Sequence, residues 1–400
     1  MSDKDRPRSA LRRHSFGGFC ANCWNAALFF ARTFVPAALA VLLLAACGSR
    51  ATRHVPPAPP PQAPPVRPAY PPTELQVHHY WQNSDASSAF DFAHDSRFVD
   101  DFVAHDAAAW VSQGAPFKQR QPQGHALFYA DFGTAGDSAA TVLDLSTARA
   151  KGWLAKHNGA EIENPLGGGT ELVDLGKAGV SEAYVSSLER KWGRRGWDGV
   201  FADDVNAWFS LWSTDSIDGY KSPLDYWRRA VLPLLEQVDR RLAADKGGIL
   251  VPNVGEWLAH PELNDVLRVA DGALQEFFLV GGDGASLDPS QIENEYASLR
   301  AAARSGKTYY AIVHRTDAQG LKYAFCATAI MAGAHADLVR LTNQSTSGSE
   351  PLTWNPVFGR HLGAPAGPIH HEQGSTQWAR AFANGRTLTI DTDGQSCTGL

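Results

Sequence analysis

The stretch of sequence that decides the fold class is Trp197-Asp198-Gly199-Val200-Phe201-Ala202-Asp203-Asp204-Val205-Asn206. The apolar run from Gly199 to Ala202 is typical of a strand buried on both faces, as in a parallel sheet covered by helices. Two adjacent carboxylates repel each other, and a strand does not need them at its end. In a parallel barrel, however, the residues that follow the strands lie at the carboxyl rim, where such barrels place their chemistry. We therefore expect Asp203 and Asp204 at a functional rim, although an Asp that caps the next helix would also explain the pattern.

The composition indicates a globular protein with a distinct amino-terminal region. The chain has 400 residues, of which 44% are hydrophobic and 20% are charged, enough for one barrel-sized domain and a tail. The net charge is −6, and residues 1–46 contain six basic but only two acidic side chains, so the rest of the chain is more acidic than the whole. Such a domain repels a phosphate backbone, and we expect no nucleic-acid partner.

Residues 1–46 have the layout of a secretory signal peptide. Basic residues precede an apolar stretch, residues 34–44, that is too short for a comfortable membrane span. The stretch leads into Leu44-Ala45-Ala46-Cys47, which is similar to the bacterial lipobox, where the cysteine is acylated and becomes the mature amino terminus. We expect a lipoprotein anchored to the cell membrane through Cys47, on the extracytoplasmic side. An ordinary signal peptide followed by a chance cysteine is the alternative.

Residues 47–74 are expected to form a linker after the acylated cysteine. Ten of the seventeen residues from 56 to 72 are proline, which excludes a helix and favours an extended polyproline II conformation. At ~3.1 Å per residue such a segment reaches roughly 50 Å. We expect a stalk that holds the following domain away from its anchor.

The other cysteines give less information. Cys20 and Cys23 have the spacing of a metal-ligand pair, but no second pair accompanies them, so we assign them no function. If Cys47 is acylated, Cys326 and Cys397 are the remaining cysteines of the mature chain. They could pair in an oxidising compartment, or Cys326 could be a buried free thiol, and the sequence leaves both possibilities open.

Residues 75–345 alternate apolar strands with amphipathic helices, the pattern of a parallel α/β fold. The candidate strands are 75–79, 102–105, 126–131, 172–174, 199–203, 248–254, 272–278, 308–314 and 337–341, and the candidate helices are 180–192, 223–246, 289–305 and 323–332. About eight strands over this length favour a (β/α)8 TIM barrel. Residues 346–400 differ, because alternating residues flank Asn384-Gly385 as in a hairpin, so a small C-terminal β appendage is predicted.

If the barrel forms, the residues that end its strands converge on one rim, and acids dominate among them. They are His105 with Asp106, Asp131, Asp174, Asp203 with Asp204, Asn253 with Glu256, Glu276, and His314 with Arg315. Hydrolysis of a glycosidic bond needs two carboxyl groups, one protonated and one ionised. Glu276 lies in the apolar run 273–278, where desolvation would raise its pKa and suit a general acid, unless an Arg or Lys pairs with it. The rim shows no convincing nucleophilic serine or cysteine, and we expect no metal and no cofactor.

Other rim residues are candidates for substrate binding. We expect Asp131 and His314 to face the substrate. Asn253 could donate a hydrogen bond to a sugar hydroxyl or merely end its strand, and Glu256 could belong to a sugar subsite or to the surface. Trp208 could stack on the apolar face of a sugar, although packing in a helix is the default for such a residue. Asp198 is expected to fix the turn before its strand.

Several stretches together resemble one family. GWDGVFADDVN, residues 196–206, is similar to the GFDGVFLDDV-type signature of the hypothetical glycosyl hydrolase family fifteen and, more distantly, to the endo-α-1,4-polygalactosaminidases. Residues 248–253, 271–276, 332–337 and 380–385 follow in the family's order, so the likeness covers roughly residues 75–395. The resemblance implies a TIM-barrel glycoside hydrolase whose catalytic pair is Asp203 or Asp204 with Glu276.

The leading hypothesis is a membrane-anchored, extracytoplasmic glycoside hydrolase that cleaves a polysaccharide with an Asp/Glu pair and acts as a monomer. The alternative is a catalytically inactive barrel that binds polysaccharide as a tethered lipoprotein. A de-N-acetylase is a further rival, but it would need a metal triad of His and Asp that the rim does not supply.

Replacing the lipobox cysteine tests the expected location. The Cys47→Ala protein should leave the membrane fraction, because it lacks the thiol that carries the acyl chains. Immunoblotting of membrane and soluble fractions measures the distribution. Equal membrane association of the Cys47→Ala and wild-type proteins would contradict the lipobox interpretation.

Overall fold

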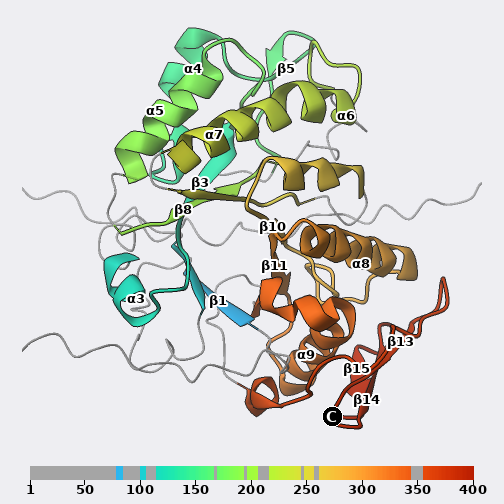
Figure 1. Ribbon diagram of the computed structural model, residues 1–400. Coiled ribbons are helices and arrows are strands. Elements are labelled where there is room, and N and C mark those ends of the chain that lie inside the picture. Colours follow the sequence, from blue (N-terminus) through green and yellow to red (C-terminus); the bar gives the residue numbers. More distant parts are fainter. Residues whose placement is uncertain are drawn as a thin grey trace, which may run out of the picture. The chain divides into compact units, whose positions relative to one another are not determined.

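Figure 1 shows a computed structural model of the protein, which describes residues 78–83, 100–104, 114–165, 169–192, 196–205, 216–244, 247–255, 261–343 and 355–400. All of them belong to Arg67–Leu400, the second of the two units into which the chain divides. No helix among them is long and apolar enough to cross a membrane. The expected signal peptide with Cys47 and the proline-rich linker lie outside the described residues.

Eight parallel strands form a barrel, and they follow one another around it in chain order. They are β1 (His78–Asn83), β2 (Asp101–Ala104), β3 (Ala126–Ala135), β8 (Gly199–Asp203), β9 (Ile249–Pro252), β10 (Gly272–Gln275), β11 (Thr308–Val313) and β12 (Val339–Asn343). Parallel pairing runs from β10 through β11, β12, β1, β2, β3 and β8 to β9. A single parallel bridge between Asn253 and Leu274 joins β9 to β10 and closes the ring. The predicted TIM barrel is thereby confirmed.

Helices cover the outside of the barrel (Figure 1). They are α3 (Gly114–Arg120), α4 (Leu145–Lys151), α5 (Val180–Trp192), α6 (Pro223–Tyr226), α7 (Leu232–Ala244), α8 (Pro289–Arg304) and α9 (Ala318–Ala332), with short 3-10 segments η3 (Pro261–Arg268), η4 (Gly333–Leu338) and η5 (Pro356–Gly359). The helix predicted over 223–246 contains a π-helical turn, η2 (Trp227–Val231). Pro233 follows this turn, and its ring would clash with the carbonyl four residues earlier in a regular helix.

One predicted strand does not belong to the barrel. Residues 172–174 were expected to be a barrel strand, but β7 (Glu171–Leu172) pairs antiparallel with the far end of β3. Leu172 and Val173 are buried, so their apolar character reflects burial outside the ring. Asp174 therefore does not end a barrel strand; its carboxylate accepts a hydrogen bond from Tyr220 at 2.6 Å. The remaining short strands of this region are β4 (Thr141–Leu143), β5 (Lys156–His157) and β6 (Ala160–Glu161).

Successive side chains of each strand point alternately into the barrel and outwards to the helices, so the protein has an inner and an outer apolar core. One apolar cluster fills the barrel, and it comprises Tyr80, Val103, Leu127, Phe201, Val251, Leu274, Tyr310 and Ile312. A separate, larger cluster lies between the strands and the helices. Because successive side chains of a strand point to opposite faces, the face of β8 that carries Phe201 also carries Asp203. The side chain of Asp203 therefore points into the mouth of the barrel.

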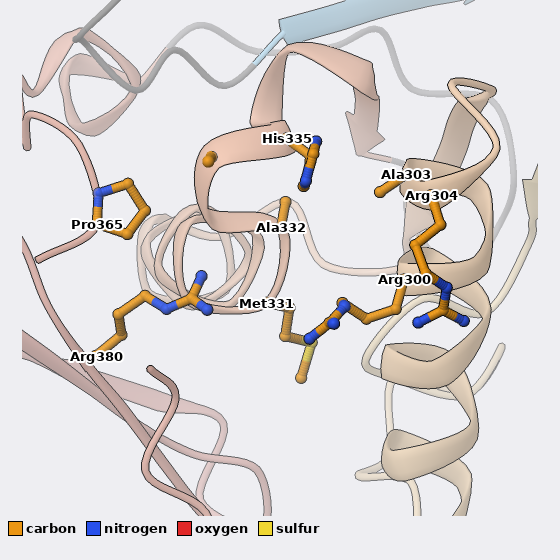
Figure 2. A pocket seen from close by; sticks show the side chains of 9 residues that line it. Arg300, Ala303, Arg304, Met331, Ala332, His335, Pro365 and Arg380 are labelled. Carbon is orange, nitrogen blue, oxygen red and sulfur yellow. The ribbon is translucent and has the colours of Figure 1, made fainter. Parts of the chain in front are cut away.

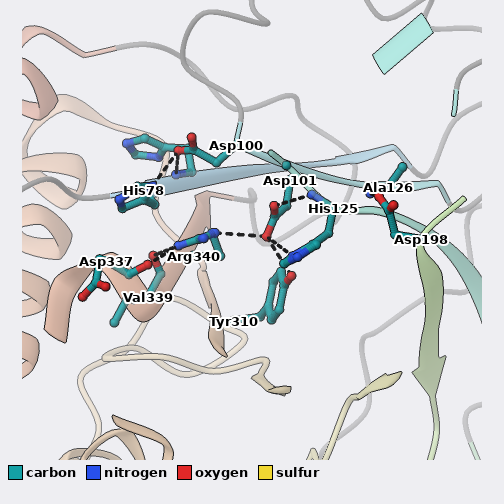
Figure 3. A network of polar contacts seen from close by, with 12 residues as sticks. His78, Asp100, Asp101, His125, Ala126, Asp198, Tyr310, Asp337, Val339 and Arg340 are labelled. Carbon is teal, nitrogen blue, oxygen red and sulfur yellow. Dashed lines mark hydrogen bonds and ion pairs between the residues drawn. The ribbon is translucent and has the colours of Figure 1, made fainter. Parts of the chain in front are cut away.

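A buried ion pair closes the amino end of the barrel (Figure 3). Arg340 of β12 donates to the carboxylate of Asp101 in β2 at 3.0 Å, and the Tyr310 hydroxyl donates to the same oxygen at 2.7 Å. The backbone N–H of His125 donates to the other oxygen at 2.7 Å. Burial alone would raise the pKa of Asp101, but the hydrogen bond from His125 and the charge of Arg340 outweigh it and hold this pKa below its usual value. The contacts tie β2, β11 and β12 together.

The C-terminal appendage is a three-stranded antiparallel sheet beside α8 and α9 (Figure 1). Its strands are β13 (Gln377–Ala381), β14 (Thr387–Asp391) and β15 (Ser396–Thr398). The predicted hairpin around Asn384-Gly385 is confirmed, and Gly385 adopts a φ of 81°, which glycine tolerates best. A disulfide between Cys326 of α9 and Cys397 of β15 fastens the sheet to the barrel. The structure thus decides the pairing that the sequence left open.

Removing the cation of the buried pair should destabilise the fold. Arg340→Met leaves the Asp101 carboxylate buried without its partner, so the free energy of unfolding should fall by about 3–5 kcal/mol at pH 7. Because the folded-state pKa of Asp101 is lowered, its stabilising contribution exists above the unfolded pKa of about 3.9 and is lost as the pH falls through the folded value. The difference between variant and wild type should therefore narrow below pH ~4.

Chemical denaturation followed by circular dichroism measures this difference. Arg240→Met is the matched control, because Arg240 pairs with Glu236 at 3.6 Å on the surface of α7 and its side chain is 69% exposed. The variant of this exposed pair should lose far less stability. Equal losses in the two variants at pH 7 would refute a structural role for the buried pair.

Candidate functional site

The carboxyl ends of the barrel strands bring four acids together. Asp131 of β3 lies opposite Asp203 of β8 in the register of the two strands, and Asp204 follows Asp203. Glu276 follows β10 directly. His314, which follows β11, lies at the same rim. Trp208, Glu256, His105 and Asp106 lie outside the described residues, so the structure says nothing of their expected roles.

Two neutral donors hold the Asp203 carboxylate. The Tyr129 hydroxyl donates to Oδ2 at 2.6 Å, and the Asn253 side-chain amide donates to Oδ1 at 2.7 Å. Tyr129 lies on β3, and Asn253 directly follows β9, so the strands on both sides of β8 supply these donors. The carboxylate is thus oriented from two sides at the mouth of the barrel.

Asn253 also contacts the second acid. The same amide nitrogen donates to Glu276 Oε2 at 3.1 Å, while its own Oδ1 accepts a hydrogen bond from the Gly255 N–H at 3.1 Å. The Gly255 contact identifies the amide orientation, because only the oxygen can accept from an N–H. Asn253 therefore lies between Asp203 and Glu276 and shares one nitrogen between them.

The acids shift one another's titration. Burial, then the charge of Asp203, raises the pKa of Glu276 to about 7, and the hydrogen bond from Asn253 opposes the rise. Burial also raises the pKa of Asp131 to about 6; hydrogen bonds from Thr134 oppose this rise, and the charge of Asp203 adds to it. The site therefore contains carboxyl groups that keep part of their protons near neutral pH, Glu276 more than Asp131, and an acid catalyst needs such a proton.

Asp204 reaches the cluster through a change in backbone direction. In a continued strand its side chain would point away from the barrel axis. Instead Asp204 has a φ of 54°, in the left-handed region, which Asp tolerates better than most residues. Burial, followed by the charges of Asp203, Asp131 and Glu276, raises its pKa well above the usual value. Asp204 therefore shares the electrostatic field of the other three acids.

Two buried residues, His314 and Glu295, contact the segment that follows Glu276. The ring of His314, which is 2% exposed, lies 5.5 Å from that of Phe277, the residue after Glu276. The buried carboxyl group of Glu295 in α8 accepts hydrogen bonds from the Leu279 N–H at 3.0 and 3.1 Å. Leu279 has a φ of 70°, so Glu295 stabilises a strained turn three residues after Glu276.

Sequence reasoning missed Tyr129 and Glu295. Tyr129 could have been predicted from the sequence, because it precedes Asp131 by two residues on the same strand and so shares its inward face. No sequence signal identifies Glu295, since its partner is a backbone N–H in a loop. Asp198 was expected to fix the turn before its own strand, but its carboxylate accepts from the Ala126 N–H at 2.8 Å and pairs with Lys118 at 2.9 Å, so it fixes the start of β3 against β8. Among the residues that the structure describes, no group of His, Cys, Asp or Glu is placed to hold a metal ion.

A parallel barrel with carboxyl groups close together at its carboxyl rim is an arrangement that glycoside hydrolases use. Residues 118–386 match the hypothetical glycosyl hydrolase family 15, and the chain belongs to this family. No curated protein matches the sequence.

Solved structures resemble the barrel at low identity. A cycloisomaltooligosaccharide glucanotransferase from Paenibacillus is 13% identical over 60% of this chain, with a TM-score of 0.42. An α-amylase from H. orenii is 9% identical over 80% of this chain and 89% of its own, with a TM-score of 0.44. The chain spans only 39% of the length of the Paenibacillus protein. The family assignment does not depend on these similarities.

Neutralising Asp203 should lower the pKa of Glu276. The charge of Asp203 is one cause of the raised value, so Asp203→Asn should move this pKa from about 7 towards the ordinary value for Glu. The carboxyl ¹³C shift of Glu276, followed by NMR across a pH titration, measures the change. Asp337→Asn, an exposed substitution before β12, is the control and should leave the titration unchanged. An unaltered Glu276 pKa in Asp203→Asn would show that the two acids are not coupled.

Proposed function

We propose that this protein is a retaining glycoside hydrolase that cleaves a polysaccharide outside the cytoplasm, with Asp203 as the nucleophile and Glu276 as the general acid/base. Membership of the glycosyl hydrolase family supports the reaction class. The bridging contact of Asn253 with both acids supports the catalytic pair and the stereochemical outcome.

The spacing of the acids favours retention. Retaining enzymes hold their two carboxyl groups about 5–5.5 Å apart, whereas inverting enzymes leave about 6.5–9.5 Å for a water molecule. One Asn253 nitrogen lies 2.7 Å from an Asp203 oxygen and 3.1 Å from a Glu276 oxygen, so these oxygens cannot be farther apart than the sum of the two distances. If each oxygen accepts one hydrogen of the planar NH₂ group, their separation is about 5 Å.

The environments of the two acids suit different roles. Asp203 accepts hydrogen bonds from Tyr129 and Asn253, and donated hydrogen bonds stabilise the ionised form that attacks as a nucleophile. Glu276, with its pKa raised to about 7 by burial and by the Asp203 charge, carries a proton available for the leaving group. The proximity of the two groups therefore produces both roles, because the charge of one keeps the other protonated.

The reaction follows in two balanced steps. In the first step the Asp203 carboxylate attacks the anomeric carbon, the glycosidic C–O bond breaks, and Glu276 gives its proton to the departing oxygen. In the second step the Glu276 carboxylate takes a proton from water as the water oxygen attacks the same carbon, and the bond to Asp203 breaks. Water is consumed, and both carboxyl groups return to their starting states.

A location outside the cytoplasm has two supports. The sequence Leu44-Ala45-Ala46-Cys47 is similar to a lipobox, and the disulfide between Cys326 and Cys397 is of a kind that persists in oxidising compartments. We propose a lipid anchor at Cys47, with the linker carrying the barrel to a polysaccharide of the cell surface. The inactive binding module is the rival, and it does not explain why the structure brings two acids within reach of one amide.

Screening the wild-type protein on a panel of polysaccharides, with new reducing ends as the readout, tests the activity. Asp203→Asn and Glu276→Gln should each reduce hydrolysis at least about 10³-fold, because each removes one half of the acid pair. Glu236→Gln on the surface of α7 is the matched control and should remain fully active. Sugar binding without hydrolysis by the wild type, across the panel, would favour the inactive module.

Two further readouts separate the roles. The rate should fall as the pH rises through about 7, because the acid must be protonated, and NMR of the first product should show the anomeric configuration of the substrate. Glu276→Gln should regain activity on a substrate with a leaving group that needs no proton, whereas Asp203→Asn should not. Inversion of configuration, or full activity of Glu276→Gln on an ordinary glycoside, would overturn the assignment.

A further inference from the structure

A cavity lies at the opposite end of the barrel from the acids. It has a volume of about 240 Å³, and its lining consists of Arg300, Ala303, Arg304, Met331, Ala332, Ala334, His335, Pro365 and Arg380. Arg304 ends α8 shortly before β11, and η4 ends directly before β12, so the cavity lies at the amino ends of the barrel strands. It therefore does not belong to the acidic rim.

The charged residues that line the cavity are all basic. Arg300 and Arg304 belong to α8, Arg380 belongs to β13, and His335 lies on η4 (Figure 2). None of the nine lining residues is acidic. Within the part of the chain that the structure describes, none of these four side chains forms an ion pair; Arg300 donates to the Tyr296 hydroxyl at 2.8 Å, which leaves its charge uncompensated. Three arginines, whose guanidinium groups stay charged at any physiological pH, thus line one small cavity.

Arg380 is held in the cavity with unused hydrogen-bonding capacity. Its Nε is buried and has no hydrogen-bond partner among the described residues. Burial lowers the pKa of Arg380, the Tyr296 phenol opposes this, and the charge of Arg300 lowers the pKa further. Gly333 makes room for the guanidinium, because a Cβ at this position would overlap Nη1 of Arg380. A half-buried guanidinium without an acid is costly unless an anion completes it.

We propose that this cavity is a binding site for a phosphate-type oxyanion. A guanidinium fork matches the oxygens of phosphate in a bidentate manner, and three positive charges suit a phosphate dianion better than a single carboxylate. The volume lies below the roughly 300–1,000 Å³ of sites that enclose whole small molecules, so the cavity takes a phosphate group and leaves any attached part outside.

The place of the cavity in the fold suggests where such a group comes from. It adjoins η4, which contacts β1, the first strand of the barrel. A phosphate group reaches this end either in the headgroup of an anionic lipid or as a free phosphate, and the two sources share the chemistry that the three arginines recognise.

Phosphate binding by the full chain tests the proposal without reference to hydrolysis. Calorimetric titration with inorganic phosphate, at constant ionic strength, should show saturable binding to one site. Arg380→Gln and Arg300→Gln should each weaken it about tenfold, since each removes a charge-assisted hydrogen bond. Ala334→Glu should abolish binding by placing a carboxylate among the arginines. Arg240→Gln, which removes an exposed arginine of α7, should bind as the wild type does.

Vesicle sedimentation distinguishes the two sources. Vesicles of phosphatidylglycerol and of phosphatidylcholine are compared for the wild type and for Arg380→Gln, so that any anchoring by the amino-terminal region is the same in both proteins. A preference of the wild type for phosphatidylglycerol that Arg380→Gln loses would identify the lipid headgroup, and calorimetric binding without this preference would identify free phosphate. Absence of saturable phosphate binding, or an equal loss in Arg240→Gln, would overturn the proposal.

Discussion

Asn253 lies where the closing seam of the barrel meets the acids at its mouth. It stands opposite Leu274 in the bridge between β9 and β10, where the N–H of the next residue, Val254, donates to Leu274 O at 3.3 Å. The Asn253 N–H donates to Ala202 O of β8 at 2.7 Å, and its side-chain nitrogen donates to Asp203 and to Glu276. Two carboxyl groups so close together repel each other, and a shared donor offsets part of that repulsion. The separation of the acids is therefore a consequence of barrel closure, because the seam brings β8, β9 and β10 to one side chain.

The buried carboxylates at the two ends of the barrel have different surroundings. At the amino end the Asp101 carboxylate meets Arg340, and its pKa is lowered. At the carboxyl end, none of the four acids forms an ion pair with a described residue, and the pKa values of Asp131, Asp204 and Glu276 are raised. Compensated charge stabilises the fold, whereas uncompensated charge keeps protons available near neutral pH. The same strands thus carry a structural end and a reactive end.

The C-terminal sheet is fastened to the barrel and contacts two loops at its carboxyl rim. The disulfide fastens β15 to α9, and one residue before β15 the Gln395 amide donates to Gly284 O at 2.9 Å and to Ser286 Oγ at 3.2 Å. Arg315 donates to the oxygen of the same amide. Gln395 therefore connects the loop that follows Glu276 to the loop that follows His314. Contacts of this kind hold two rim loops in place, so loss of the appendage would loosen the site as well as the surface.

Local patterns in the sequence determined the barrel and most of the acids. The run that ends in Asp203 predicted its strand to the residue, and the helix over residues 180–192 was predicted with the same accuracy, because burial on both faces and helical spacing are local properties. The strand expected at residues 172–174 was wrong as a barrel strand, since an apolar pattern reports burial and not the partner that provides it.

Only the tertiary structure decided how the acids interact. The sequence placed Asp203, Asn253 and Glu276 at separate strand ends, but the shared amide nitrogen, the Tyr129 hydroxyl and the pairing of Cys326 with Cys397 depend on which strands and helices become neighbours. The raised pKa of Glu276 depends on burial and on a charge located 73 positions earlier in the chain. The sequence determines the residue types and their spacing along the chain. The distances between the acids and their desolvation arise only when the barrel closes.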